Sequence, residues 1–168
     1  MDEARFGRIN RPVRCWAPPG VRPVIGCQVV REYTYAYTAV CPTDGRSCSL
    51  ILPSMQTACF QTFLDELSAR FPDELVVMVC DGAGSHGAGE LQVPENIRLI
   101  SLPPYSPELN PVEQIWALLR ERYFANKIMA SMTDVQAVLV EALNWLIQAT
   151  TTLQTLTHRD WATTHQTV

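Results

Sequence analysis

Hydrophobic and polar positions divide the chain into a strand-rich first part and a second part in which strands and helices alternate. Residues 5–23 contain two glycines and four prolines, so this segment is predicted to be largely loop. Residues 24–30, 33–40 and 47–52 are rich in valine, threonine and tyrosine, which favour strands. Thr43-Asp44-Gly45 supplies a hairpin turn between the last two. Together these stretches predict an antiparallel meander.

An amphipathic helix is predicted next, begun by Ser54 as its cap and ended by Pro72. Its apolar positions fall on one face, at Phe60, Phe63, Leu64, Leu67 and Phe71. Residues 75–80 are apolar throughout, which is typical of a strand buried on both faces of a parallel sheet. Residues 97–102 predict a second buried strand, which a crossover would place parallel to the first.

Two later helices are marked by start signals. Asn110-Pro111-Val112-Glu113 combines an N-cap asparagine, a proline at the first helical position and a glutamate three residues after the cap. Thr133-Asp134-Val135-Gln136 begins the last predicted helix with the same kind of box. The residues predicted to face inward are Val112, Ile115, Trp116, Leu119 and Tyr123 in the first helix and Val135, Val138, Leu139, Ala142 and Leu146 in the second. This order of elements predicts an α/β fold with one mixed, five-stranded sheet flanked by helices, for which the RNase H-like fold is the obvious candidate.

Composition narrows the class of protein. A chain of 168 residues suits a single domain, here predicted at residues 1–150 and followed by an unassigned tail at residues 151–168. It is 47% hydrophobic and 18% charged, as in ordinary globular proteins. No apolar run approaches the roughly 18 residues of a membrane span, and the amino terminus does not resemble a signal peptide. Six scattered cysteines lack metal-ligand spacing, which argues against zinc and favours reduced thiols in the cytoplasm.

The distribution of charge is more informative than the net charge of −4. Between Ala4 and Arg31 the chain has no acidic residue and six arginines, namely Arg5, Arg8, Arg11, Arg14, Arg22 and Arg31. Guanidinium groups bind phosphate through paired hydrogen bonds. On charge alone, however, a solvated basic loop is an equally good interpretation, so these arginines only support a function indicated by other residues.

Asp81 and Glu113 are the acidic residues whose positions suggest chemistry. Asp81 follows a predicted parallel strand, at the edge where α/β proteins bind ligands, although Asp-Gly also simply favours a turn. Glu113 is either only a capping residue or a carboxylate at the margin of the packed helix face. Asp2 and His86 resemble ordinary surface residues on local grounds. Carboxylates that converge from distant segments can hold two divalent ions about 3.5–4 Å apart, an arrangement suited to phosphodiester cleavage.

Longer motifs resemble a known family. Residues 103–116, PPYSPELNPVEQIW, resemble the PPYSPxLNPxExxW signature of bacterial insertion-sequence transposases in the Tc/mariner superfamily. Residues 79–86, VCDGAGSH, are similar to the second block of that family, and residues 2–7, DEARFG, are similar to its first block. Residues 16–20, WAPPG, match a further element of the family. The resemblance extends from residue 2 to about residue 150.

This resemblance implies a catalytic and metal-binding triad of Asp2, Asp81 and Glu113, which would hold two Mg²⁺ or Mn²⁺ ions. Such enzymes cleave DNA at transposon ends and join the freed 3′-OH to target DNA, generally at TA. His86 would lie beside the metals, and the arginines at positions 5, 8, 11, 14 and 22 would follow DNA phosphates. The expected partners are double-stranded DNA, a second copy in a homodimer and a separate helix-turn-helix module, in the bacterial cytoplasm at the nucleoid.

Two departures from the family pattern add expectations. Gly82 stands where many relatives have asparagine, which we expect to be tolerated. The first aspartate of the family lies within a central strand, whereas Asp2 follows only Met1, so the first strand is expected to be truncated and to hold Asp2 loosely. The alternative function is therefore a catalytically silent transposase remnant that binds DNA or a transposase partner. An RNase H-type nuclease would share the fold, but the proline-rich block before Glu113 points away from it.

Overall fold

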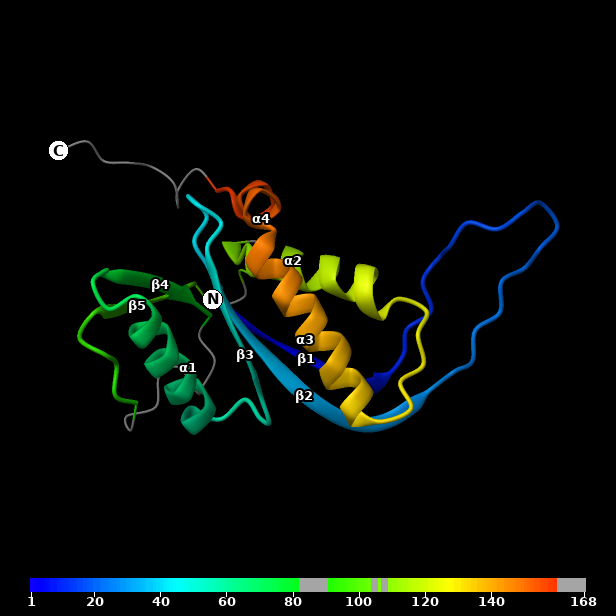
Figure 1. Cartoon of the computed structure of the whole chain (residues 1–168), viewed down its shortest axis with the longest axis horizontal. Coiled ribbons are helices and arrows are strands. Elements are labelled where there is room, and N and C mark those ends of the chain that lie inside the picture. Colours follow the sequence, from blue (N-terminus) through cyan, green and yellow to red (C-terminus); the bar gives the residue numbers. More distant parts are fainter. Residues whose placement is uncertain (82–90, 104–105, 107–108, 160–168) are drawn as a thin grey trace.

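The computed structural model describes residues 1–81, 91–103, 106 and 109–159. Strands and helices follow one another as predicted for an α/β fold (Figure 1). In chain order they are β1 (Asp2–Ile9), β2 (Val29–Val40), β3 (Ser47–Leu52), α1 (Thr57–Arg70), β4 (Val76–Cys80), β5 (Ile97–Ser101), α2 (Val112–Leu119), the π-helical turn η2 (Arg120–Phe124), α3 (Met132–Gln148) and α4 (Thr150–Thr157). The last helix, α4, lies in the region that the sequence pattern left unassigned.

The described strands form two hydrogen-bonded sheets. β1, β2 and β3 are antiparallel in that order, with Asp2 opposite Thr38. β4 and β5 form a parallel pair, as predicted. The Met1 amino nitrogen donates a hydrogen bond to the Val79 carbonyl oxygen at 2.6 Å, so the start of β1 lies against β4. The five strands are thus present, divided three and two.

The main difference from the predicted elements is at β1. Residues 2–9 form a strand in which Ala4 and Phe6 are buried, although glycine and proline content predicted loop from residue 5. The long loop begins instead at Asn10, where the backbone N–H donates to the Gln28 carbonyl at 3.1 Å. The strand predicted at residues 24–30 is wrong except for its last two residues, which open β2.

Helices cover both faces of the three-stranded sheet. Ala36 and Tyr37, neighbours on β2, point to opposite faces. Ala36 packs in a core with residues of α2, α3 and α4, whereas Tyr37 packs with α1, β4 and β5. The predicted stripe of α2 and η2 is buried throughout, and so is the predicted stripe of α3 except Val138, which is partly buried.

Two helices start at other residues than predicted. Helix α1 begins at Thr57 without a side-chain cap, so Ser54 is not its cap. The box that begins α3 is formed by Ser131 and Asp134, not by the box predicted from Thr133. Serine and aspartate also fit the capping-box pattern. The sequence was therefore compatible with two starting positions of this helix, two residues apart.

β4 and β5 are buried on one side only. Met78 and Cys80 are buried, but Val77 is 56% exposed on β4 and Ile100 is 51% exposed on β5. The prediction of strands buried on both faces is therefore wrong, because an apolar run does not reveal which face other elements cover. None of the described helices is long and apolar enough to cross a membrane. All six cysteines are free thiols.

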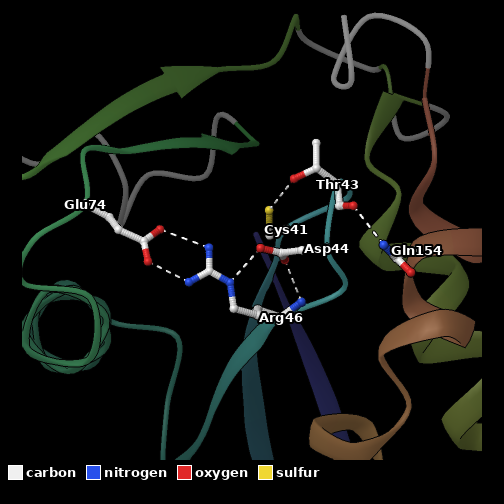
Figure 2. Close-up of polar contacts among 6 residues, drawn as sticks. All are labelled: Cys41, Thr43, Asp44, Arg46, Glu74 and Gln154. Atoms are coloured by element: carbon white, nitrogen blue, oxygen red, sulfur yellow. Dashed lines mark hydrogen bonds and ion pairs between the residues drawn. The ribbon is translucent and has the colours of Figure 1, made fainter. Parts of the chain in front are cut away.

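The predicted hairpin turn between β2 and β3 is confirmed. Gly45 has a φ of 74°, and the Cys41 N–H donates to the Arg46 carbonyl at 2.8 Å. The Arg46 guanidinium binds both carboxylate oxygens of Glu74, at 2.6 and 3.0 Å (Figure 2). On the other side, the Gln154 side chain of α4 donates to the Thr43 carbonyl at 2.8 Å (Figure 2). The turn is therefore fixed to the loop between α1 and β4 on one side and to α4 on the other.

Candidate active site

Asp2 is a buried carboxylate held by a helix. Asp2 is 6% exposed. Trp116 lies on α2, and its indole Nε1–H donates a hydrogen bond to Asp2 Oδ2 at 2.9 Å. The residue also begins the β1–β2 ladder, opposite Thr38. The expectation that a truncated strand would hold Asp2 loosely is therefore wrong, because a fully buried tryptophan orients its side chain.

Glu113 lies in the first turn of α2, one turn before Trp116, and is exposed. Burial raises the pKa of Asp2 to about 6, and the nearby Glu113 carboxylate contributes in the same direction, whereas the Trp116 hydrogen bond opposes the shift. The predicted capping box is not formed: Asn110 Oδ1 accepts the Val112 N–H at 3.2 Å, but no hydrogen bond joins the Glu113 carboxylate to the Asn110 N–H. The Glu113 side chain is therefore not engaged as a cap.

Asp81 directly follows β4, as the sequence pattern predicted, and it is exposed. Its charge acts on the Met1 amino group together with the charges of Asp2 and Glu3, while burial lowers the pKa of that amino group. Met1 thus lies between the start of β1 and the end of β4. His86 lies outside the described residues.

Carboxylate oxygens dominate the potential ligands of this region. In the part of the chain that the structure describes, no three histidine, cysteine, aspartate or glutamate side chains are gathered closely enough to hold a metal ion. However, the charge of Glu113 contributes to the raised pKa of Asp2. A divalent cation would stabilise such a pair of like charges, and an all-oxygen set suits Mg²⁺ or Mn²⁺ better than zinc.

Arg120 is a further candidate that the sequence pattern did not single out. It lies two helical turns after Glu113, with its guanidinium 5.3 Å from the centre of the Phe6 ring. Desolvation lowers the pKa of Arg120, whereas the Glu113 and Asp2 carboxylates act in the opposite direction. The charges of both carboxylates therefore act on this guanidinium. The seven-residue spacing from Glu113 was the available signal, since it places both residues on one side of the helix.

The arginines near the amino terminus are divided between strand and loop. Arg5 stacks on the Tyr33 ring at 4.3 Å, and Arg8 is paired with the Glu32 carboxylate at 2.7 Å, so both lie on β1 and are engaged within the protein. The other three candidates, Arg11, Arg14 and Arg22, are exposed on the loop of residues 10–28. This loop projects from the body of the molecule (Figure 1).

A family model described as DDE superfamily endonuclease matches residues 1–136, which include all three acidic residues. The chain belongs to the DDE superfamily of endonucleases. This DDE chain is 36% identical over 131 residues to the "Uncharacterized protein y4pE/y4sA" of Sinorhizobium fredii (strain NBRC 101917 / NGR234), an alignment that covers 77% of this chain and 97% of that protein.

Solved structures of Mos1 transposase share the fold of this DDE chain. The Mos1 paired-end complex with left transposon end matches with a TM-score of 0.60 and 16% identity, over 92% of this chain and 53% of that one. The Mos1 mariner paired end complex with Mn matches with a TM-score of 0.61 and 16% identity, over 96% and 53%. The chain spans about half the length of these transposase chains. The predicted RNase H-like fold and the assignment to the DDE superfamily are confirmed.

Proposed function

We propose that this chain is the catalytic domain of a metal-dependent DNA transposase that cleaves transposon ends and joins the freed 3′-OH to target DNA. The observation that carries the proposal is the hydrogen bond from Trp116 to Asp2, which holds Asp2 against helix α2, whose first turn carries Glu113. Asp81 lies at the neighbouring end of β4, close enough to act on Met1. All three residues fall within the segment matched to DDE endonucleases.

Each acidic residue has a defined part in this proposal. Asp2, Asp81 and Glu113 would hold two Mg²⁺ or Mn²⁺ ions, which supply activation of the attacking oxygen and stabilisation of the leaving oxygen. Trp116 orients the Asp2 carboxylate through the indole N–H. Arg120 provides positive charge beside an acidic centre that would otherwise repel a phosphodiester.

Neutralising Glu113 tests the proposal without disturbing the fold. The variant Glu113→Gln should keep its melting temperature, because the side chain is exposed and closes no cap. Mn²⁺-dependent nicking of supercoiled DNA should fall by about 100-fold or more. The matched control is Glu121→Gln, an exposed glutamate on η2, which should nick as the wild type does. Undiminished nicking by Glu113→Gln would remove Glu113 from the site.

A catalytically silent chain that binds DNA or a transposase partner is the second candidate. It is favoured by the lack of a three-ligand cluster among the described residues. Titration of Mn²⁺ against the wild type and Asp81→Asn separates the two functions. Metal-dependent stabilisation and nicking in the wild type alone support catalysis, whereas no response in either chain supports the silent function.

The proposed partners are double-stranded DNA at transposon ends and TA targets, a second copy of the chain, and a separate helix-turn-helix module. Two structures of similar fold are described as Mos1 complexes with a transposon end or as a Mos1 paired end complex, which supports DNA as a partner. Duplexes that carry the flanking ends of the gene should bind more tightly than scrambled duplexes only when the recognition module is supplied. Equal binding without the module would contradict its role.

A further inference from the structure

The loop of residues 10–28, which projects from the body of the molecule (Figure 1), is closed at its root by an asparagine side chain. Asn10 Nδ2 donates to the Gly26 carbonyl oxygen at 2.8 Å, and Asn10 Oδ1 accepts the Gln28 N–H at 2.8 Å. The Asn10 backbone N–H donates to the Gln28 carbonyl oxygen at 3.1 Å. The two ends of the loop are therefore joined to each other by three hydrogen bonds.

Two further side-chain amides tie the loop to residues 125–131, which connect η2 to α3. Asn126 Oδ1 accepts the Val13 N–H at 3.0 Å, and Asn126 Nδ2 donates to the Val13 carbonyl oxygen at 3.2 Å. The Gln28 amide makes the same pair of bonds with the Met129 backbone, accepting at 3.0 Å and donating at 2.8 Å. Each amide thus exchanges two bonds with one residue, as a hydrogen-bonded pair in an antiparallel ladder does. The outgoing part of the loop is held at Val13 and the returning part at Gln28.

The connecting segment that makes these bonds is itself anchored. The Met129 side chain is 6% exposed and belongs to the core that includes residues of α2 and α3. The Met129 carbonyl oxygen also accepts the Arg8 Nε–H at 3.0 Å. Asn126 has a φ of 55°, a left-handed conformation that asparagine adopts more readily than most residues. The root of the loop is therefore fixed to the core through this segment.

The tip of the loop is also restricted in conformation. The Val21 N–H donates to the Pro18 carbonyl oxygen at 3.1 Å and closes a turn with Pro19 and Gly20 at its centre. Gly20 has a φ of 81°, and proline followed by a glycine of positive φ is the pattern of a type II turn. The loop contains four prolines, and each fixes its own φ. Both root and tip are thus held, although residues 11–24 are exposed.

We infer that Asn10, Gln28 and Asn126 are positioning residues, which hold this loop in the conformation in which it binds duplex DNA. The inference rests on the proposed function, in which the three exposed arginines of the loop contact phosphates. The loop contains no acidic residue, so its charge is complementary to that of DNA. A preformed loop avoids the loss of conformational entropy that a mobile loop would undergo on binding. The three amides therefore raise DNA affinity without touching DNA.

Neutral variants of the amides test this role, because they leave every charge of the loop in place. Asn126→Gly removes both bonds to Val13 and keeps a residue that tolerates the positive φ. Its affinity for a short fluorescent duplex, measured by anisotropy at low salt, should fall about five- to tenfold. The slope of log K against log salt should stay that of the wild type, because the phosphate contacts are retained. Gln28→Ala, which loses the bonds to Met129, should behave in the same way.

The matched control is Asn144→Ala, which removes an exposed neutral amide from α3 and should leave both affinity and slope unchanged. A second measurement follows the loop without DNA. Exchange of the Val13 amide hydrogen, measured by nuclear magnetic resonance, should be at least about tenfold faster in Asn126→Gly than in the wild type. Both measurements are made well below the melting temperature of each variant, so the compared chains are folded.

Three results would overturn the inference. The first is unchanged exchange at Val13, which would mean that the amide does not hold the loop. The second is faster exchange with wild-type DNA affinity, which would mean that loop conformation does not matter for binding. The third is wild-type DNA affinity with an altered monomer–dimer equilibrium in sedimentation, which would assign the loop to a protein partner. A wild-type chain that binds no duplex at low salt would contradict the proposed function as well, and this result is distinct from the other three.

Discussion

A buried carboxylate that lies near a second carboxylate is unfavourable in its charged form, and the fold holds Asp2 in this position. Trp116 donates one hydrogen bond to it, which offsets only part of the desolvation. Burial therefore dominates and raises the pKa of Asp2 to about 6. At neutral pH and without a bound cation, the charged Asp2 opposes folding.

The free energy of unfolding of the metal-free chain should consequently fall as the pH rises. The pKa of Asp2 is about 6 in the folded state and 3.8 as the reference value, so its stabilising contribution is complete below about pH 4 and is lost above pH 6. A pKa difference of about 2 corresponds to roughly 3 kcal/mol. Urea denaturation at several pH values between about 4 and 6 measures this change in the free energy of unfolding. Asp2→Asn keeps an acceptor for Trp116 and should lack this fall, and wild-type and variant curves that run parallel would contradict the expectation.

Replacing Trp116 by phenylalanine should separate orientation from packing. The variant loses the indole N–H to Asp2, so stability should fall by about 1–3 kcal/mol and half-maximal nicking should need about tenfold more Mn²⁺. Ile115→Val is the control at the next buried position, with an expected loss of about 0.5–1.5 kcal/mol and an unchanged Mn²⁺ requirement. An equal change in both variants would mean that Trp116 acts only through packing.

Among strands and helices, periodicity predicted buried faces better than boundaries. The apolar stripe from Val112 to Tyr123 is buried as predicted, because helix packing requires a continuous apolar side. Residues 5–9 of β1 were predicted as loop because Gly7 and the prolines that follow outweighed the alternation of Asp2, Ala4 and Phe6. Residues 24–28 have strand-like composition but form no strand, because the β1–β2 pairing ends at Ile9 and Val29. Pairing depends on distant residues that local composition does not contain.

The β2–β3 turn allows a test of one such distant contact. Gly45 and Gly20 both have positive φ angles, 74° and 81°, but a Cβ at Gly45 would collide with the Thr150 backbone, whereas nothing lies near Gly20. Both changes to alanine carry backbone strain of about 1 kcal/mol. Gly45→Ala should destabilise the chain by about 2–4 kcal/mol in total, because α4 must also shift. Thermal denaturation that ranks the two variants equally would show that the Thr150 contact is unimportant.

For the molecule as a whole, the sequence indicated which acidic residues to consider but not how they are held. Asp81 and Glu113 were identifiable from a strand end and a helix start, and the family motifs added Asp2. The Trp116 bond to Asp2 and the position of Arg120 beside the carboxylates depend on packing between β1 and α2. Trp116 and Asp2 are 114 positions apart, so spacing could not predict their contact, whereas the seven-residue spacing of Glu113 and Arg120 was visible in the sequence.

Some arginines near the amino terminus contact other side chains of the protein, whereas others are exposed. This difference leads to a prediction about DNA binding. Arg5 and Arg8 are engaged on β1, whereas Arg11, Arg14 and Arg22 are exposed on the projecting loop. If these three bind phosphates, their joint replacement by glutamine should weaken duplex binding and reduce the slope of log K against log salt by about 2–3. Fluorescence anisotropy at several salt concentrations measures the slope.

The control for this prediction is Arg70→Gln, which removes an arginine paired with Glu66 at the end of α1 and should leave the slope unchanged. The melting temperature of the triple variant should stay near that of the wild type, because its three side chains are exposed. Since the chain carries a net charge of −4, binding through an arginine-rich loop requires that this loop dominate the local potential. An unchanged slope in the triple variant would place the DNA-binding surface elsewhere, with Arg120 as the next cation to replace.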